Sequence, residues 1–95
     1  MKPIKTTAWE PADYLQSEEE ITAYLADVFS TNDTQLIIAA IGDVARARGM
    51  SKVAQDAHCG RESLYKSLSQ NGNPSFDTIL KVMSALGYVL KPFHV

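Results

Sequence analysis

The stretch SKVAQDAHCGRESLYKSL, residues 51–68, constrains the fold most because it contains two short helical patterns with little chain between them. Apolar residues recur at helical spacing on both sides of His58-Cys59-Gly60, which interrupts the pattern. Ser51 is a suitable N-cap for the first pattern. The sequence therefore predicts a short helix, a tight turn and a second helix at about 61–69. The apolar positions are Val53, Ala54 and Ala57 in the first helix and Leu64 and Leu68 in the second.

Three further helices are predicted at about 18–29, at about 34–48 and from Ser75 to Gly87. Ser17 with Glu20 forms a capping-box pattern, and Asp33 and Ser75 are also good N-caps. Glycines at the ends of the second and third of these helices suit a left-handed stop. The positions expected to face inward are Ile21, Tyr24, Leu25, Val28 and Phe29, then Leu36, Ile37, Ala40, Ile41, Val44 and Ala45, and finally Ile79, Leu80, Val82, Met83 and Leu86.

The two ends of the chain have different patterns. The first residues contain two prolines, and we expect an extended segment with a helical turn at Pro11 to Leu15 and with Trp9 and Tyr14 folded back on the body. The tail YVLKPF alternates and is rich in β-branched and aromatic residues, which predicts a short strand. Pro92 would restrict that strand to a sheet edge.

The chain has 95 residues, 45% of them hydrophobic and 21% charged, which predicts a single folded domain. With the helical patterns and the tail pattern above, we expect a compact all-α domain with a short edge strand at its end. We divide residues 1–95 into an extended segment with an acidic helix (1–33), a helical core (34–87) and a tail (88–95). The single cysteine excludes an internal disulfide, and no apolar run approaches the roughly 20 residues of a membrane span. A cytoplasmic protein is therefore expected.

Charge is distributed unevenly along the chain. Residues 1–35 contain seven acidic residues and two lysines, whereas residues 36–95 contain four acidic and seven basic residues. The net charge of −2 argues weakly against nucleic-acid binding, but the basic second part favours it. The pattern indicates two different surfaces, although solvated helix faces alone could produce it.

The helix pair at 51–69 has the outline of a helix-turn-helix, whose second helix enters the major groove of DNA. If its leucines face inward, the side chains of Arg61, Glu62, Tyr65 and Lys66 project outward where base edges are reached. Arginine and lysine can bind guanine, and a glutamate can accept a hydrogen bond from cytosine. Alternatively, these four side chains form an ordinary solvated helix face. The turn before the helix favours the DNA-binding interpretation.

The remaining polar residues near the turn have two interpretations each. Ser51, Lys52 and Ser63 are candidates for phosphate contacts, because helix N-termini suit anions, although Ser51 could serve only as a cap. Asn71 and Asn73 are more typical of a turn than of a phosphate contact.

His58-Cys59 could be a reactive or metal-binding pair, but adjacent residues in a turn rarely have that geometry. We interpret Cys59 as a small apolar plug beneath the turn. The chain is predicted to be neither an enzyme nor a cofactor or metal protein.

Residues 42–87 resemble the addiction-module antidote proteins, which are prophage-associated, HigA-like relatives of Xre/Cro-type repressors with a lambda-repressor-like helix-turn-helix. The resemblance extends over about residues 8–91, and its most specific parts are RESLYK, GNPSF and LKVMSALG. It implies an antitoxin that represses its own operon as a homodimer and neutralises a RelE/ParE-like toxin. Gly60 and Arg61 through Lys66 match the recognition helix of the family.

The turn departs from the family pattern, which has glycine and serine where this chain has His58 and Gly60. We expect His58 to adopt the positive φ that glycine adopts more easily. Glycine at an N-cap costs only a few tenths of a kcal/mol, so the fold should survive both changes. Two other functions are compatible with the sequence: a stand-alone phage-type repressor, or a module that binds a basic protein through the acidic helix without binding DNA.

Overall fold

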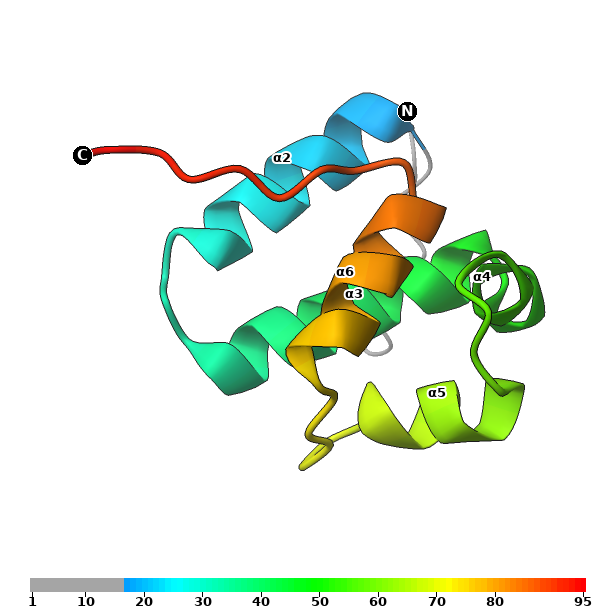
Figure 1. Ribbon diagram of the computed structural model, residues 1–95. Coiled ribbons are helices and arrows are strands. Elements are labelled where there is room, and N and C mark those ends of the chain that lie inside the picture. The colour runs from blue at the N-terminus through cyan, green and yellow to red at the C-terminus, as the bar shows by residue number, and fades with distance from the viewer. Residues whose placement is uncertain (1–16) are drawn as a thin grey trace, which may run out of the picture.

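A computed structural model describes residues 17–95, and in this range the chain is entirely helical apart from its turns and tail (Figure 1). The all-α prediction is confirmed for these residues. None of their helices is both long and apolar enough to cross a membrane. The helices are α2 (Glu18–Phe29), α3 (Thr34–Arg48), α4 (Met50–Asp56), α5 (Arg61–Ser67) and α6 (Phe76–Ala85).

Side-chain caps begin the three longer helices, as the sequence predicts. Ser17 accepts a hydrogen bond from the Glu20 amide at 3.1 Å, while the Glu20 carboxylate accepts one from the Ser17 amide at 3.3 Å. Asp33 and Ser75 each accept from the amide three residues further on, at 3.2 and 3.1 Å. These bonds satisfy amides that have no partner within the helix.

The prediction that Ser51 caps α4 is wrong. α4 already begins at Met50, so Ser51 is its second residue, and the preceding Gly49 supplies no side-chain cap. Gly49 has a φ of 104° and ends α3 as predicted, but the same residue also starts α4. The chain turns directly from one helix into the next, and this leaves no extended residue in which a serine could cap.

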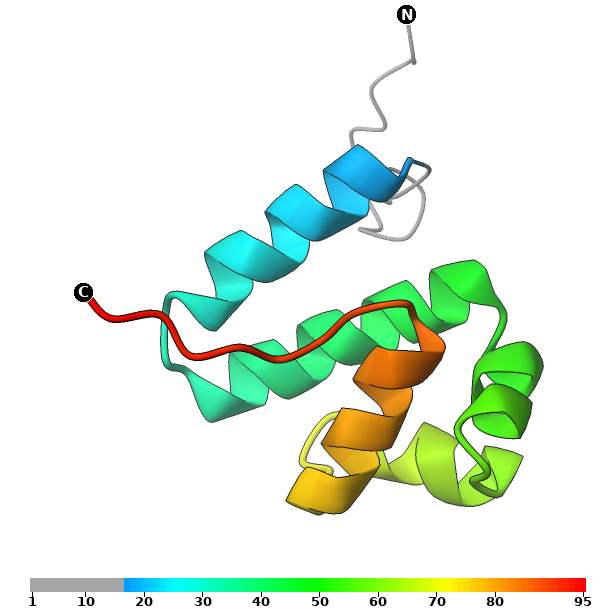
Figure 2. The same cartoon turned by 45° about the horizontal axis from the view of Figure 1, so that its top comes forward.

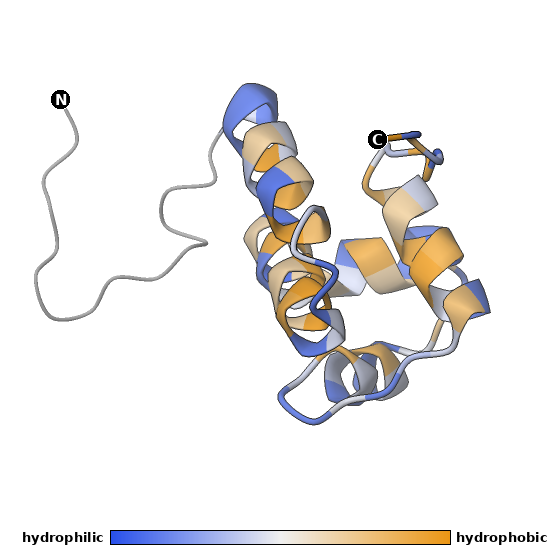
Figure 3. Cartoon of the chain, turned by 90° about the vertical axis from the view of Figure 1, so that its left-hand side faces the viewer, coloured by the Kyte–Doolittle hydropathy of each residue, from blue (hydrophilic) through white to orange (hydrophobic). Residues whose placement is uncertain are grey.

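The core lies between α2 and α3 and around α4, which packs against α3, α5 and α6. Hydrophobic and hydrophilic residues alternate along the helices (Figure 3). Leu36 and Leu80 depart from the prediction because their side chains are 44% and 41% exposed, whereas Ile38 is buried. Leu80 lies roughly a third of a turn from the middle of the buried face of α6, and Leu36 lies nearly opposite the buried face of α3. Adjacent apolar residues on a helix cannot all face the core, and the sequence pattern alone did not separate them.

Polar contacts attach α2 to the rest of the molecule. The Tyr24 hydroxyl donates to Asp43 of α3 at 3.1 Å, and Arg48 forms an ion pair with Glu18. Burial, together with the adjacent Asp43 carboxylate, raises the pKa of Tyr24 to about 12. α2 is therefore an integral part of the domain.

At the start of the tail, the Tyr88 hydroxyl forms a hydrogen bond with the Thr22 hydroxyl of α2 at 2.8 Å. The tail then runs from the end of α6 toward the side where α2 and α3 are joined (Figure 2). The predicted edge strand is wrong, since residues 88–95 contain no strand. A strand needs a neighbour to pair with, and residues 17–95 provide none. The predicted turn at Pro11 to Leu15 and the packing of Trp9 and Tyr14 lie outside the described residues.

Candidate nucleic-acid interface

Two backbone hydrogen bonds at the end of α4 shape the turn between α4 and α5. The His58 amide donates to the Gln55 carbonyl at 3.2 Å, and the Cys59 amide donates to the Ala54 carbonyl at 2.9 Å. These are the two bonds of a Schellman motif, which requires a left-handed residue between the helix cap and the outgoing chain. His58 is that residue, with a φ of 57°, so the predicted positive φ is confirmed.

Cys59 and Gly60 complete the turn. Cys59 is partly buried against the core, and its thiol points to the Ala57 carbonyl at 3.5 Å. It occupies the apolar position beneath the turn that the sequence indicates. Gly60 is the N-cap of α5 and makes no side-chain hydrogen bond, so the α5 N-terminus is open to solvent.

The direction of α5 is fixed by Leu64 and Leu68, each only 1% exposed. All four side chains that the sequence predicts to face outward are exposed, and Tyr65 among them is 45% exposed. α5 lies at one edge of the molecule, opposite α2 (Figure 1). The structure therefore brings Arg61, Glu62, Tyr65 and Lys66 together on one exposed helix of two turns.

Ion pairing distinguishes the cations of α5 from most other cations. Four cationic side chains form ion pairs, so carboxylates already neutralise their charges. Within residues 17–95, neither Arg61 nor Lys66 has an acidic partner, so their charges are available to an anionic ligand. The pairs are Arg46 with Asp43 (2.7 Å), Arg48 with Glu18, Lys52 with Asp56 (3.2 Å) and Lys81 with Asp77 (3.0 Å).

The candidate phosphate contacts are exposed but not equivalent. Ser51 and Lys52 lie in the first turn of α4, where Lys52 already pairs with Asp56, and Ser63 lies in the first turn of α5. Asn71, in the loop after α5, has a φ of 65°. That conformation supports the turn interpretation of Asn71. Asn73 is exposed in the same loop.

Gly42 is a positioning residue that the sequence reasoning missed. It is buried in α3, and a Cβ built there would lie 2.6 Å from the Leu68 carbonyl oxygen at the end of α5. Only glycine allows so close an approach, because a backbone oxygen cannot move aside as a side chain would. The available signal was a glycine in the middle of an otherwise continuous helical pattern.

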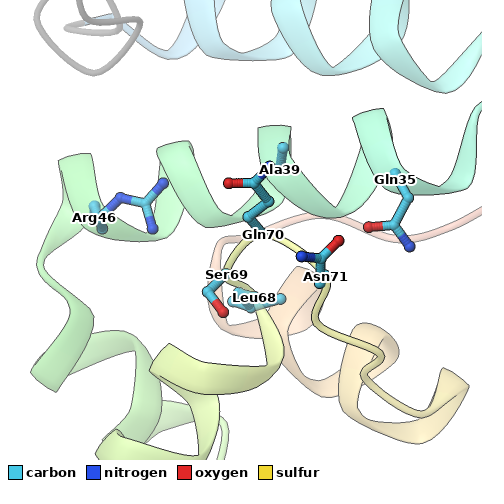
Figure 4. Close-up of a pocket in the computed structure, with 7 residues that line it drawn as sticks. All are labelled: Gln35, Ala39, Arg46, Leu68, Ser69, Gln70 and Asn71. Atoms are coloured by element: carbon cyan, nitrogen blue, oxygen red, sulfur yellow. The ribbon is translucent and has the colours of Figure 1, made fainter.

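A hollow of about 540 Å³ lies beside this contact, between α3 and the loop after α5 (Figure 4). Amide, hydroxyl and guanidinium groups line it, and one of these belongs to Asn71. Within residues 17–95, no three His, Cys, Asp or Glu side chains lie close enough to hold a metal ion. The residues that line the hollow are Gln35, Ala39, Arg46, Leu68, Ser69, Gln70 and Asn71. The exposed face of α5 remains the best candidate site.

Comparison with known proteins gives two matches. A family model described as a probable addiction module antidote protein matches residues 5–93. An uncharacterized protein of Haemophilus influenzae is 51% identical over 78 residues, which cover 82% of this chain and 80% of the relative. No solved structure matches the chain significantly.

Proposed function

Because the chain belongs to the family of probable addiction module antidote proteins, we propose that it is the antitoxin of a type II toxin–antitoxin module. In this proposal it is a cytoplasmic, non-enzymatic, prophage-associated protein of the HigA-like type. It represses its own operon as a homodimer, reads operator DNA with α5, and neutralises a RelE/ParE-like toxin.

The turn between α4 and α5 is the observation that carries the DNA-binding part of the proposal. The Schellman bonds and the left-handed His58 hold two short helices at a fixed angle, as a helix-turn-helix of the Xre/Cro type requires. The second of these helices exposes Arg61 and Lys66, neither of which is neutralised by a carboxylate of residues 17–95. A cation at the start of a helix in the major groove is suited to bind guanine.

Binding of a toxin is supported by the family description and by the charge of α2. Three glutamates occupy the first turn of α2, and α2 lies on the side of the molecule away from α5 (Figure 1). One face could therefore contact a basic protein while the other contacts DNA. This arrangement also keeps open the alternative of a protein-interaction module without DNA binding, and a stand-alone phage-type repressor would use only the α5 face.

A gel-shift titration with the DNA upstream of the gene separates these functions. We expect a shift at about 50 mM salt that weakens by at least roughly tenfold near 200 mM, because phosphate contacts release counterions. No shift at low salt would exclude the repressor function and favour the protein-interaction module. A small gene directly beside this one, whose product is toxic alone and harmless together with this chain, supports the antitoxin over the stand-alone repressor.

A further inference from the structure

An exposed apolar pair stands on the outer side of α6. The side chains of Phe76 and Leu80 are 69% and 41% exposed, and they are neighbours because they lie four residues apart on the helix. Next to them is a hollow of about 350 Å³ between α6 and the end of α4. The same surface thus carries a protruding ring and a recess. The recess is lined by Asp56, Ala57, His58, Leu80, Lys81 and Ser84.

The charges beside this pair are of both signs. Asp77 and Lys81, also four residues apart, form an exposed ion pair at 3.0 Å. The Asp77 carboxylate raises the pKa of Lys81, so the amine remains cationic at neutral pH. A surface that carries a protruding apolar side chain, a recess, an anion and a cation can contact a second copy of itself across a two-fold axis, because each feature then meets its opposite.

We propose that this α6 surface, formed by Phe76, Asp77, Leu80, Lys81 and the recess, binds the same surface of a second copy of the chain. The two α6 helices run antiparallel across a two-fold axis near position 78 or 79. Phe76 of each copy packs on Leu80 and the recess of the other. Asp77 of each copy faces Lys81 of the other, and the interface is isologous.

The position of the surface favours a second copy over another partner. α6 follows the loop after α5, and its first turns lie next to that loop (Figure 1). A two-fold axis places both copies of α5 at the same height along the axis, and a contact through α6 holds them near it because α5 and α6 both pack against α4. Helix-turn-helix dimers need such an arrangement to contact two half-sites about 34 Å apart. Only this last argument rests on the proposed function, because the self-complementary surface is present whether or not α5 binds DNA.

Sedimentation of the full chain tests the interface directly. We expect the unmodified chain to form a dimer and Phe76→Glu to raise the dimer dissociation constant by at least about tenfold, since a buried aromatic anchor is lost. Val89→Glu is the matched control, because Val89 is 86% exposed in the tail, outside this surface. It should leave the dissociation constant unchanged. Phe76→Glu should fold normally, since its ring is mostly exposed and an acidic residue suits the first turn of a helix.

Charge-reversal variants provide a second test of the interface. Its expected result, recovery of association on mixing two variants, cannot arise from effects within a single chain. Asp77→Lys and Lys81→Asp each place like charges across the two-fold axis, so each variant alone should dimerise more weakly than the unmodified chain. Mixing the two variants places opposite charges across the axis and should restore association through a mixed dimer. A mixture that associates no better than either variant contradicts the proposed register.

Three results overturn the proposal. The first is an unmodified chain that remains a monomer at about 100 μM, a concentration at which even weak specific dimers form. The second is a dimer that Phe76→Glu does not weaken. The third is a dimer that Val89→Glu weakens as much as Phe76→Glu does. Because none of these measurements contains DNA, failure of the interface and failure of the DNA-binding proposal are distinguishable.

Discussion

Replacing His58 with glycine should stabilise the protein, although glycine usually weakens helical domains. His58 has a φ of 57° at the end of α4. A left-handed conformation costs a residue with a Cβ roughly 1–2 kcal/mol, and glycine avoids this cost. The greater freedom of glycine in the unfolded chain offsets about 0.5–1 kcal/mol of the gain. His58 is exposed, so no packing is lost. The expected net gain is about 0.5–1 kcal/mol.

α6 ends in the same motif with glycine in the left-handed position, and this provides a control within the chain. The Gly87 amide donates to Ser84 at 3.0 Å and the Tyr88 amide donates to Met83 at 2.8 Å, with Gly87 at a φ of 92°. A Cβ on Gly87 would meet nothing within 4 Å, so Gly87→Ala reports the backbone conformation alone. It should destabilise the protein by about 1 kcal/mol or more.

Thermal and urea unfolding followed by circular dichroism measure both variants. For a domain of this size, His58→Gly should raise Tm by about 2–8 °C, whereas Gly87→Ala should lower it. His58→Val should lower Tm, because a branched side chain tolerates positive φ less well than histidine. If His58→Gly lowers the stability while Gly87→Ala behaves as expected, the imidazole makes a stabilising contact and the argument from backbone strain is refuted.

Three further predictions concern packing, ionisation and capping. Gly42→Ala should destabilise the protein by about 1–3 kcal/mol in urea unfolding and weaken DNA binding, because the added methyl displaces the end of α5; unchanged stability and affinity would contradict the close contact. Folding raises the pKa of Tyr24 from 10.0 to about 12, so the stabilisation of the folded state by the protonated Tyr24 hydroxyl is complete below pH 10 and is lost between pH 10 and 12. Tyr24→Phe should therefore lose less free energy of unfolding over that range than the unmodified chain. Parallel curves of stability against pH for the two proteins would exclude the effect. Ser75→Ala should cost about 1 kcal/mol in urea unfolding, and Ser84→Ala, on an exposed part of the same helix, should cost much less; equal losses would contradict a capping role.

The sequence predicts those parts of the fold that depend on local chemistry. Ser17, Asp33 and Ser75 begin helices because their side chains accept hydrogen bonds from amides three residues away. The positive φ of His58 also followed, since a turn that short between two helices needs a left-handed residue, and the family resemblance indicates which one.

Features set by contacts distant in sequence could not be predicted. Gly42 matters because of the Leu68 carbonyl, twenty-six positions away in the numbering and visible only once α3 and α5 are packed. The tail pattern is typical of a strand, but a pattern cannot supply the neighbouring strand. Ser51 has the chemistry of a cap, yet Gly49 already begins α4, because the turn after α3 is tighter than the sequence pattern indicates.

The central claim, that α5 reads DNA sequence, is tested most directly by the ratio of affinities for operator and for scrambled DNA. Arg61→Ala should lower that ratio by about 1–3 kcal/mol of discrimination, because it removes a base contact. Lys52→Ala, at the start of α4, should weaken binding to both DNAs alike. An unchanged ratio in Arg61→Ala, or equal losses in both variants, would contradict the assignment of α5 as the reading helix.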